Sequence, residues 1–428
     1  MYICILNKIE MYNLLTYNQA VDLTQGNEAP FYEARFVVDG YNISIFNYRL
    51  AMYSDFRDNS AFEMRGLTFV FNEDGSLYNR YLLLHKFFNL NQVEDSQYSL
   101  VKDYEIKSIY NKEDGSVASF IRLPNGRVLA KSKMSFESDQ AMGMMRLYNS
   151  NKELRDFVNW TLDNDFVAVF EYVAPHNRIV LRYSDEELIL LRLRNNKTGE
   201  YLDLSKYSDK IGSLKVAPSD VGTLDELIEL AHSVEDKEGW IVEFHNGLFI
   251  KIKTVWYCER HGLLTDDLWR EHILVGYVLD EKIDDVLGQV PEEEVEAHSR
   301  IEKIIEVVKH SVSEKAVDIL KSYDLFLEGG VGRDWEGELR LQLMRKAFAL
   351  KYRKDPNFGY VMSLSKGADV YDLAKDWLRD KTKKLHIARD FLKLRDPSLF
   401  FVDKEVDEDE WKITHLFLYI VYETFKKI

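Results

Sequence analysis

The sequence predicts an α+β protein, with an N-terminal region built on antiparallel β-sheet followed by an all-α C-terminal region. Two patterns indicate this. Up to about residue 260, short β-like runs alternate with turn signals, whereas after about residue 263 apolar residues recur at helical spacing. The length of 428 residues suits two domains, which we place at 1–262 and 263–428.

The predicted strands are short apolar runs, and several are joined by glycine-containing turns that favour hairpins. The strands are Leu67–Asn72, Ser116–Arg122, Arg127–Lys131, Phe166–Tyr172, Arg178–Tyr183, Leu188–Arg194, Trp240–His245 and Phe249–Thr254. The hairpin turns are Asp74-Gly75, Pro124-Asn125-Gly126 and Asn246-Gly247. Two helices interrupt the strands, near Asn151–Leu162 and Leu224–Ser233.

The C-terminal region repeats apolar residues three and four apart, as one face of a helix requires. The repeats are Ile301, Ile304, Ile305 and Val308, then Leu339, Leu343, Met344 and Ala347, then Leu416 to Phe425. Glycine and proline at Glu328-Gly329-Gly330 and Asp355-Pro356 separate these helices. The acidic run Asp403–Glu410 reads as a solvated loop or a helix start.

The formal net charge of −16 argues against a protein that coats nucleic acid, because phosphate contacts require Lys and Arg. The charge is uneven: residues 201–300 hold 10 basic and 22 acidic residues, whereas residues 351–400 hold 12 and 7. Local basic patches on an acidic protein suit an enzyme that touches a short piece of nucleic acid.

The cysteine content and the absence of long apolar runs favour a reducing, cytoplasmic setting. Cys4 and Cys258 cannot form a disulfide framework or a zinc site by themselves. We find no signal peptide and no stretch of about 20 apolar residues, so no membrane partner is expected.

Lys112-Glu113-Asp114-Gly115 is the most informative segment, because it places a lysine on a tight turn. A lysine attacks only as the neutral amine, and its free pKa of about 10.4 must be lowered by burial or nearby positive charge. The chain repeats the turn without the lysine, at Asn72–Ser76. We therefore interpret Glu-Asp-Gly-Ser as a hairpin turn and Lys112 as a candidate nucleophile.

Later residues supply what such a nucleophile needs at a nucleotide phosphate. Glu171 follows a buried strand, where a carboxylate can accept hydrogen bonds from a ribose. Glu238 opens another strand and can hold Mg²⁺ beside phosphates. Lys251 and Lys253 share one strand face and can neutralise an α-phosphate, although a solvated edge strand would show the same pattern.

This ordered set resembles the covalent nucleotidyltransferases: DNA ligases, RNA ligases and mRNA capping enzymes. Finer matches within residues 40–260 resemble the phage-type RNA ligase 1 family, which implies an antiparallel-sheet nucleotidyltransferase (ATP-grasp-like ligase) domain. The matching segments are Glu63–Gly66, Lys86–Asn91, Lys112–Ser116, Lys131–Lys133, Phe170–Pro175, Asn177–Val180, Glu238-Gly239 and Lys251–Tyr257.

The resemblance implies a role for each matching residue. The implied catalytic residues are Lys112, which would carry AMP, Glu171 at the ribose, Glu238 with the metal, and Lys251 and Lys253 at the α-phosphate. The implied contacts to ATP or the RNA 5′-phosphate are Tyr48, Arg65, Lys86, Phe88, Glu113, Lys131, Lys133 and Tyr257. Metal ligands would be Glu238, Asp284 and Asp285. Each aromatic residue here could equally be a packing residue of the core.

The implied activity is that of an ATP-dependent RNA ligase. ATP would donate AMP with Mg²⁺ or Mn²⁺, and single-stranded RNA with 5′-phosphate and 3′-hydroxyl ends, such as a nicked tRNA anticodon loop, would be joined. We expect a monomer in the cytoplasm, the host cytoplasm if the protein is from a phage. The helical region would choose the RNA, with Lys375–Arg395 as the candidate contact surface.

Two alternatives remain open at this point. A DNA ligase or capping enzyme usually carries an OB-fold after the last lysine motif, which the helical periodicity after residue 263 argues against. A non-catalytic nucleotide- or RNA-binding protein of the same fold would not need the catalytic residues, and all of them are present here.

Overall fold

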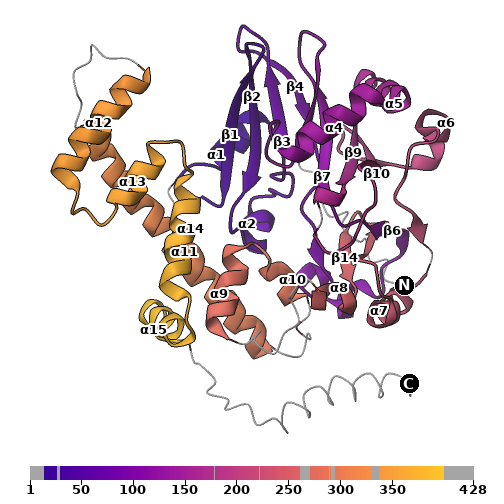
Figure 1. Cartoon of the computed structure of the whole chain (residues 1–428). Helices are drawn as coiled ribbons and strands as arrows, with labels where there is room; N and C mark the ends of the chain where they lie inside the picture. Colours follow the sequence, from indigo (N-terminus) through magenta and orange to yellow (C-terminus); the bar gives the residue numbers. More distant parts are fainter. Residues whose placement is uncertain are drawn as a thin grey trace.

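The computed structural model describes residues 14–26, 29–177, 179–220, 222–260, 270–288, 290, 295–328 and 337–399. It has the predicted mixed α+β character with antiparallel sheets (Figure 1). The predicted domain boundary at residues 262 and 263 lies outside the described residues. So do Cys4, Arg178, Asp403–Glu410 and Leu416–Phe425.

Three sheets form the N-terminal region. The first has the order β1-β2-β3-β4, with β1 Phe31–Val38, β2 Tyr41–Tyr48, β3 Leu67–Phe71 and β4 Leu77–Tyr81. The second has the order β11-β10-β9-β7-β8, with β7 Ser116–Arg122, β8 Val128–Ser132, β9 Phe166–Val173, β10 Glu187–Asn195 and β11 Tyr201–Leu202. The third has the order β12-β6-β13-β14-β5, with β5 Phe88–Asn89, β6 Ile106–Lys112, β12 Ser219–Asp220, β13 Gly239–Phe244 and β14 Phe249–Lys253.

Helices cover the sheets and form the rest of the described chain after Lys253. In the N-terminal region they are α1 Tyr17–Asp22, α2 Tyr53–Asp58, α3 Tyr98–Val101, α4 Asp139–Ser150, α5 Lys152–Asp163, α6 Ser208–Ile211, α7 Leu224–Ser233 and α8 Val255–Arg260. They continue with α9 Glu271–Leu279, α10 Ile283–Leu287, α11 Val295–Glu328, α12 Gly337–Tyr352, α13 Phe358–Leu364, α14 Val370–Thr382 and α15 Leu385–Arg395. None of these described helices is long and apolar enough to cross a membrane.

Alternation along the strands decides which side chains reach the space between the sheets. On β9, Ala168 and Phe170 pack under α5, while Val167 and Val169 join the core shared by the three sheets. Glu171 continues this second series, so it points between the sheets. On β14, Phe249 lies in the same shared core, and Lys251 and Lys253 follow it on that face.

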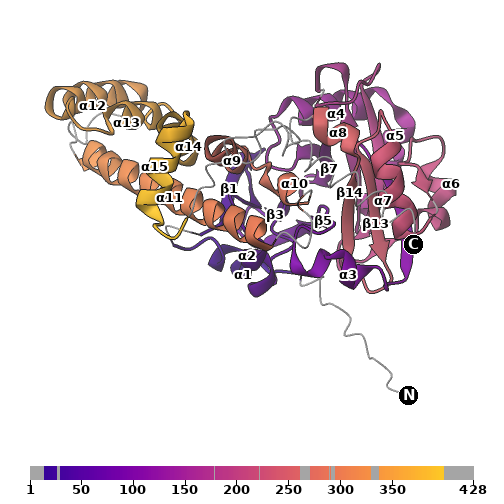
Figure 2. The ribbon, with the colours of Figure 1, turned by 90° about the horizontal axis from the view of Figure 1, so that it is seen from below.

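The helical region has its own apolar core, formed by α9, α10, α11, α14 and α15. Leu50 and Met52, from the loop after β2, pack against this core and join it to the first sheet. A smaller cluster of Phe326, Met344 and Phe348 lies farther along α11. Figure 2 shows α11 extending from the sheets to α12 and α13 at the opposite end of the molecule.

Several local predictions are confirmed. The three predicted hairpin turns join β3 to β4, β7 to β8, and β13 to β14, and each pair is antiparallel. Helices α5 and α7 lie where helical periodicity predicts them, and each begins at a capping side chain, Asn151 and Thr223. β14 is flanked by β13 and β5, so Lys251 and Lys253 do not lie on a solvated edge strand.

Two local predictions are wrong. The described part of the predicted strand 178–183 is not a strand, because the N–H groups of Val180 and Leu181 donate to the Asp114 carboxylate instead of a neighbouring strand. The turn after Lys112 is not a hairpin, because β6 and β7 belong to different sheets. The segment Glu113–Gly115 therefore carries the chain from one sheet to the other.

Candidate active site

A cavity of about 300 Å³ lies where the strand ends of the second and third sheets face α10. Many of the predicted site residues come together in its wall. The lining residues are Tyr48, Arg65, Leu84, His85, Lys86, Phe87, Lys112, Glu113, Gly115, Val117, Glu171, Leu191, Ile241, Lys251, Lys253, Glu281, Asp284 and Asp285. Polar groups from distant parts of the chain thus converge over an apolar floor, as ligand pockets require.

Lys112 and Lys253, which line the cavity, share one oxygen of the Glu238 carboxylate, although Glu238 itself does not line the cavity. Lys112 Nζ lies 2.7 Å and Lys253 Nζ 3.3 Å from Glu238 Oε1, and Glu238 is almost fully buried. The second oxygen, Oε2, is buried and accepts no hydrogen bond from the described part of the chain. Buried polar atoms are normally paired, so Glu238 Oε2 is an unsatisfied acceptor on the carboxylate that Lys112 and Lys253 share.

Asp114 fixes the loop that carries Lys112. Its Oδ2 accepts hydrogen bonds from the N–H groups of Val180 (2.8 Å) and Leu181 (2.7 Å), and its Oδ1 accepts one from the Tyr257 hydroxyl (2.8 Å). Asp114 therefore ties together three segments far apart in the chain. The role of Asp114 is to hold these segments in position. Tyr257 donates its hydroxyl to Asp114 and does not line the cavity, so its predicted contact to ATP stays a prediction.

Gly115 packs directly onto β9. A Cβ atom at Gly115 would lie 2.4 Å from the carbonyl oxygen of Tyr172, so no side chain fits there. Its N–H donates to Glu171 Oε1 at 3.1 Å. Burial raises the pKa of Glu171 to about 8, although the charge on Lys112 opposes the shift. Glu113 also lines the cavity, and burial raises its pKa.

The cations of the cavity differ in their partners. Burial, together with the neighbouring charge of Lys86, lowers the pKa of Lys251 to about 7. Burial alone would also lower the pKa values of Lys86 and Lys253, but the carboxylates beside them raise both above the usual range. Arg65 completes the set and donates to the carbonyl of Leu84 at 3.3 Å. The wall thus offers four cations besides Lys112.

Two predicted lysines lie away from the cavity wall. Lys131 is fully buried and donates to the carbonyl oxygen of Gly66 at 3.0 Å. Burial, with the charge of Arg65, lowers its pKa to about 7. Lys133 Nζ lies 5.1 Å from the ring centroid of Tyr48, and Tyr48 lines the cavity. Neither lysine contributes to the lining, so contacts to ATP remain predictions for both.

The predicted aromatic contacts divide in the same way. Tyr48 lines the cavity. Phe88 instead lies in the core with Tyr53 and Phe56, at centroid distances of 5.2 and 6.1 Å, and does not line the cavity. Lys86 Nζ reaches both predicted aromatics, 5.3 Å from Tyr48 and 4.9 Å from Phe88. These rings therefore help to hold Lys86.

Asp284 and Asp285 on α10 reach into the cavity and pair with its lysines. Lys86 Nζ lies 2.5 Å from Asp284 Oδ2, and Lys253 Nζ lies 2.9 Å from Asp285 Oδ2. Burial would raise the pKa of Asp285, but Lys253 and Lys251 hold it well below the usual range. Among the described residues, no three His, Cys, Asp or Glu side chains are grouped to hold a metal ion. The metal role of Glu238, Asp284 and Asp285 remains a prediction.

Sequence reasoning missed the apolar floor, formed by Val117, Leu191 and Ile241. These are ordinary strand residues in sequence, and only the approach of two sheets makes them a surface. It also missed Asn89, whose Nδ2 donates to the Asp284 carbonyl at 3.1 Å and to Asp285 Oδ1 at 3.2 Å. Asn89 lies within the matching segment Lys86–Asn91, which could have indicated that it belongs to the site.

The candidate RNA surface Lys375–Arg395 carries less free charge than its composition suggests. Lys375 pairs with Glu281 at 2.8 Å and Arg379 with Asp280 at 2.7 Å. Arg389 pairs with the buried Glu271, and Arg395 with Glu314. Four basic side chains of this stretch therefore hold the helical region together.

Comparisons with known proteins agree with the motif analysis. Residues 63–258 match the model of the RNA ligase family, which confirms the resemblance to phage-type RNA ligases over this segment. A relative from Thermovibrio ammonificans named "Putative RNA ligase" is 28% identical over 286 residues, covering 65% of this chain and 74% of the relative. A second, from Autographa californica nuclear polyhedrosis virus, is named "Putative bifunctional polynucleotide kinase/RNA ligase"; it is 25% identical, and the match spans 41% of this chain and 28% of that protein.

Among solved structures, an archaeal ATP-dependent RNA ligase aligns over 84% of this chain and 98% of its own, at 10% identity and a TM-score of 0.43. A Naegleria gruberi RNA ligase with PPi aligns over 41% of this chain and 57% of its own, at 12% identity and a TM-score of 0.34. The match thus spans less than two thirds of the Naegleria chain.

Proposed function

We propose that this chain is an ATP-dependent RNA ligase that joins 5′-phosphate and 3′-hydroxyl ends of single-stranded RNA. The observation that carries the proposal is the position of Lys112, whose amine lies in a cavity with Arg65, Lys86, Lys251 and Lys253. A nucleophile among four cations suits attack on a triphosphate, because negative charge grows on phosphate oxygens during the reaction. The match of residues 63–258 to RNA ligases supports RNA as the substrate.

In the first step, the neutral amine of Lys112 attacks the α-phosphorus of ATP. A nitrogen–phosphorus bond forms, the bond from the α-phosphorus to the bridging oxygen breaks, and pyrophosphate leaves. The amine proton is lost, and Glu238 Oε1, 2.7 Å from Nζ, is the nearest carboxylate oxygen to receive it. Lys251 and Lys253 face the same cavity and would stabilise charge on the α-phosphate.

In the second step, the 5′-phosphate of RNA attacks the same phosphorus. A 5′–5′ phosphoanhydride forms, the lysine–phosphorus bond breaks, and Lys112 takes up a proton. In the third step, a 3′-hydroxyl attacks the RNA 5′-phosphorus, a phosphodiester bond forms, and AMP leaves. Glu171 would hold the ribose throughout, because its side chain points between the sheets beside Gly115.

The residues present also fit a divalent cation beside the phosphates. Glu238 offers a buried carboxylate oxygen, Oε2, that accepts no hydrogen bond within the described residues, and carboxylate oxygen is the ligand that Mg²⁺ and Mn²⁺ prefer. When bound, the ion would offset the negative charge of the phosphates. We assign Glu238 as its first protein ligand.

The proposed division of labour gives residues 1–262 the adenylyl transfer and residues 263–428 the choice of RNA. The described elements after Lys253 are helices, which suits an RNA ligase better than an enzyme with an OB-fold. A nicked tRNA anticodon loop is the proposed natural substrate. Comparing it with an unstructured RNA of equal length would measure this preference.

The decisive test is incubation of the purified protein with ATP labelled at the α-phosphate, followed by denaturing gel electrophoresis. We expect label on the wild-type protein and none on Lys112→Ala. The matched control is Lys107→Ala on the same strand, since Lys107 pairs with Glu243 outside the cavity. An unlabelled wild type, or a Lys112→Ala protein labelled as strongly, would overturn the proposal. GTP and nicked duplex DNA in parallel reactions separate the ligase from capping enzymes and DNA ligases.

A further inference from the structure

We propose that Asp284 and Asp285 compete inside the molecule with the phosphates of ATP, so that ATP binding and the docking of α10 exclude each other. This inference rests on the proposed function, because it takes Lys86 and Lys253 as phosphate contacts. It adds a device that adenylyl transfer itself does not require: a pair of carboxylates that stands in for phosphate oxygens until nucleotide replaces it.

The geometry shows that α10 already occupies the cations. Asp284 pairs with Lys86 at 2.5 Å and Asp285 with Lys253 at 2.9 Å. The two lysine side chains are only 8% and 7% exposed, so little of either ammonium group faces solvent. A triphosphate that reaches both lysines must therefore displace at least one carboxylate.

The rest of α10 is held closely against the pocket. Asn89 Nδ2 donates to the Asp284 carbonyl and to Asp285 Oδ1, and a Cβ at Gly288 would lie 2.7 Å from the Asn89 Cβ. Asn89 thus links the backbone of α10 to the Asp285 carboxylate, so displacing that carboxylate would disturb the helix. Ile283, Val286 and Leu287 pack in the core of the helical region, so displacing α10 would unpack these three side chains.

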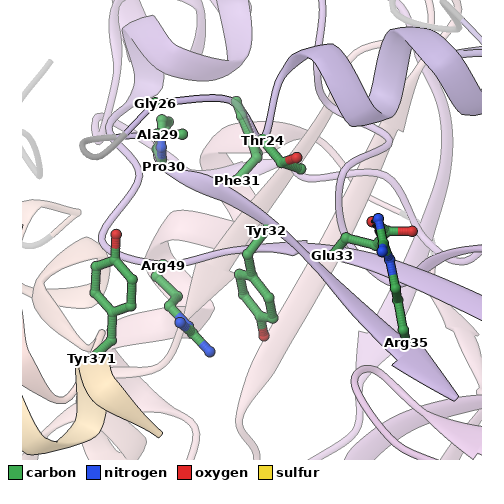
Figure 3. Close-up of a pocket in the computed structure, with 10 residues that line it drawn as sticks. All are labelled: Thr24, Gly26, Ala29, Pro30, Phe31, Tyr32, Glu33, Arg35, Arg49 and Tyr371. Carbon is green, nitrogen blue, oxygen red and sulfur yellow. Dashed lines mark hydrogen bonds and ion pairs between the residues drawn. The ribbon is translucent and has the colours of Figure 1, made fainter. Parts of the chain in front are cut away.

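A second contact between the same two regions lies apart from this pocket. The Arg49 guanidinium lies between the rings of Tyr32 and Tyr371 (Figure 3), 4.0 and 4.9 Å from their centroids. It also pairs with Asp369 at 2.7 Å. It borders another cavity, of about 320 Å³, that shares no lining residue with the nucleotide pocket. Asp369→Asn removes one aspartate charge and one ion pair at this second contact without touching α10 or the phosphate site, and serves as the control.

The test is equilibrium binding of the α,β-methylene analogue of ATP, which cannot transfer AMP to Lys112, measured by calorimetry in EDTA and again with Mg²⁺. The apparent affinity for nucleotide is the intrinsic affinity multiplied by the fraction of molecules in which the carboxylates have left the lysines. Asp284→Asn and Asp285→Asn raise that fraction, so we expect both variants to bind the analogue about three- to tenfold more tightly in EDTA. Asp369→Asn should bind within twofold of wild type. If the two variants bind nucleotide as wild type does, or more weakly, in EDTA, the inference is overturned. If they bind more weakly only when Mg²⁺ is present, the two aspartates are metal ligands instead and the inference is again overturned.

A wild-type protein that binds neither ATP nor the analogue would overturn the proposed function together with this inference, whereas wild-type binding with no gain in the variants overturns the inference alone. Hydrogen exchange of the unaltered protein gives a second readout that does not depend on the variants folding. Adding the analogue should speed amide exchange across Ile283–Leu287 and leave Val370–Thr382 unchanged. Slower or equal exchange in α10 contradicts the competition.

Discussion

Replacing Gly115 by alanine should be far more damaging than the same change at Gly75, although both glycines follow Glu-Asp. A Cβ at Gly115 would lie 2.4 Å from the Tyr172 carbonyl oxygen, about 1 Å inside ordinary contact, and this oxygen belongs to a paired strand. No atom lies within 4 Å of the Cβ position at Gly75, but the residue has a φ of +82°, which a side chain would strain. Overpacking costs about 1–3 kcal/mol, and left-handed strain about 1 kcal/mol.

We therefore expect Gly115→Ala to lose about 3 kcal/mol of unfolding free energy and Gly75→Ala about 1 kcal/mol, measured by urea unfolding. The activities should separate more widely. A shift on the order of 1 Å at Gly115 moves Lys112 relative to Glu171, and displacements of this size cost about a hundredfold in rate. Gly75→Ala should keep its adenylylation rate. Equal stability losses in the two variants, or full activity in Gly115→Ala, would refute the steric reasoning.

Three further predictions concern buried polar groups and are measured by urea unfolding. The pKa of Lys131 is about 7 when folded and about 10.4 when unfolded, so the unfolded chain binds more protons between these values and wild-type stability rises with pH across the window. Lys131→Met should therefore gain on the order of 3 kcal/mol of unfolding free energy over wild type near pH 7, and the gain should fade toward pH 10. Parallel pH profiles of the two proteins would contradict this. The pKa of Glu171 is about 8 when folded and about 4.3 when unfolded, so the unfolding free energy of the wild type falls as pH rises through this window. The unfolding free energy of Glu171→Gln should therefore rise relative to wild type from about pH 4.5 to about pH 8 and then stay level. A difference that does not change with pH would argue against a buried acid. Tyr257→Phe removes the hydrogen bond to Asp114 and should cost about 2 kcal/mol; a loss below 0.5 kcal/mol would show that this bond contributes little.

Local sequence predicted those parts of the fold whose partners are close in the chain. The hairpins at Asp74-Gly75 and Asn246-Gly247 follow from turn chemistry, and α7 follows from its Thr223 cap and apolar spacing. β1 was missed because polar residues such as Glu33 and Arg35 interrupt its apolar pattern. Strand β2, which pairs with β1, was missed as well, since neither strand of a hairpin is stable without the other.

Most of the charged residues that line the cavity could be named from the sequence, because their order and spacing are specific. Glu238, Lys131 and Lys133 were also named but do not line it, and Glu281 lines it but was not named. Their pairing was not predictable. Nothing local to Lys112 shows that β6 and β7 enter different sheets, because the strands that flank them come from later in the chain. The ion pairs from α10 to Lys86 and Lys253 likewise join residues about 198 and 32 positions apart. Tertiary packing alone brings them together.

The chain contains one tetrapeptide twice, in two unrelated settings. Among the described residues, the Asp74 carboxylate accepts hydrogen bonds from Ser76 alone, at 2.9 and 2.6 Å, whereas the Asp114 carboxylate accepts from groups 66, 67 and 143 positions away. The conformation of the Lys112 loop thus depends on contacts far away in the sequence: grafting Lys112–Ser116 onto the β3–β4 hairpin would transfer the sequence without the conformation. Moving the proposed site to another position in the fold would require moving these distant contacts with it.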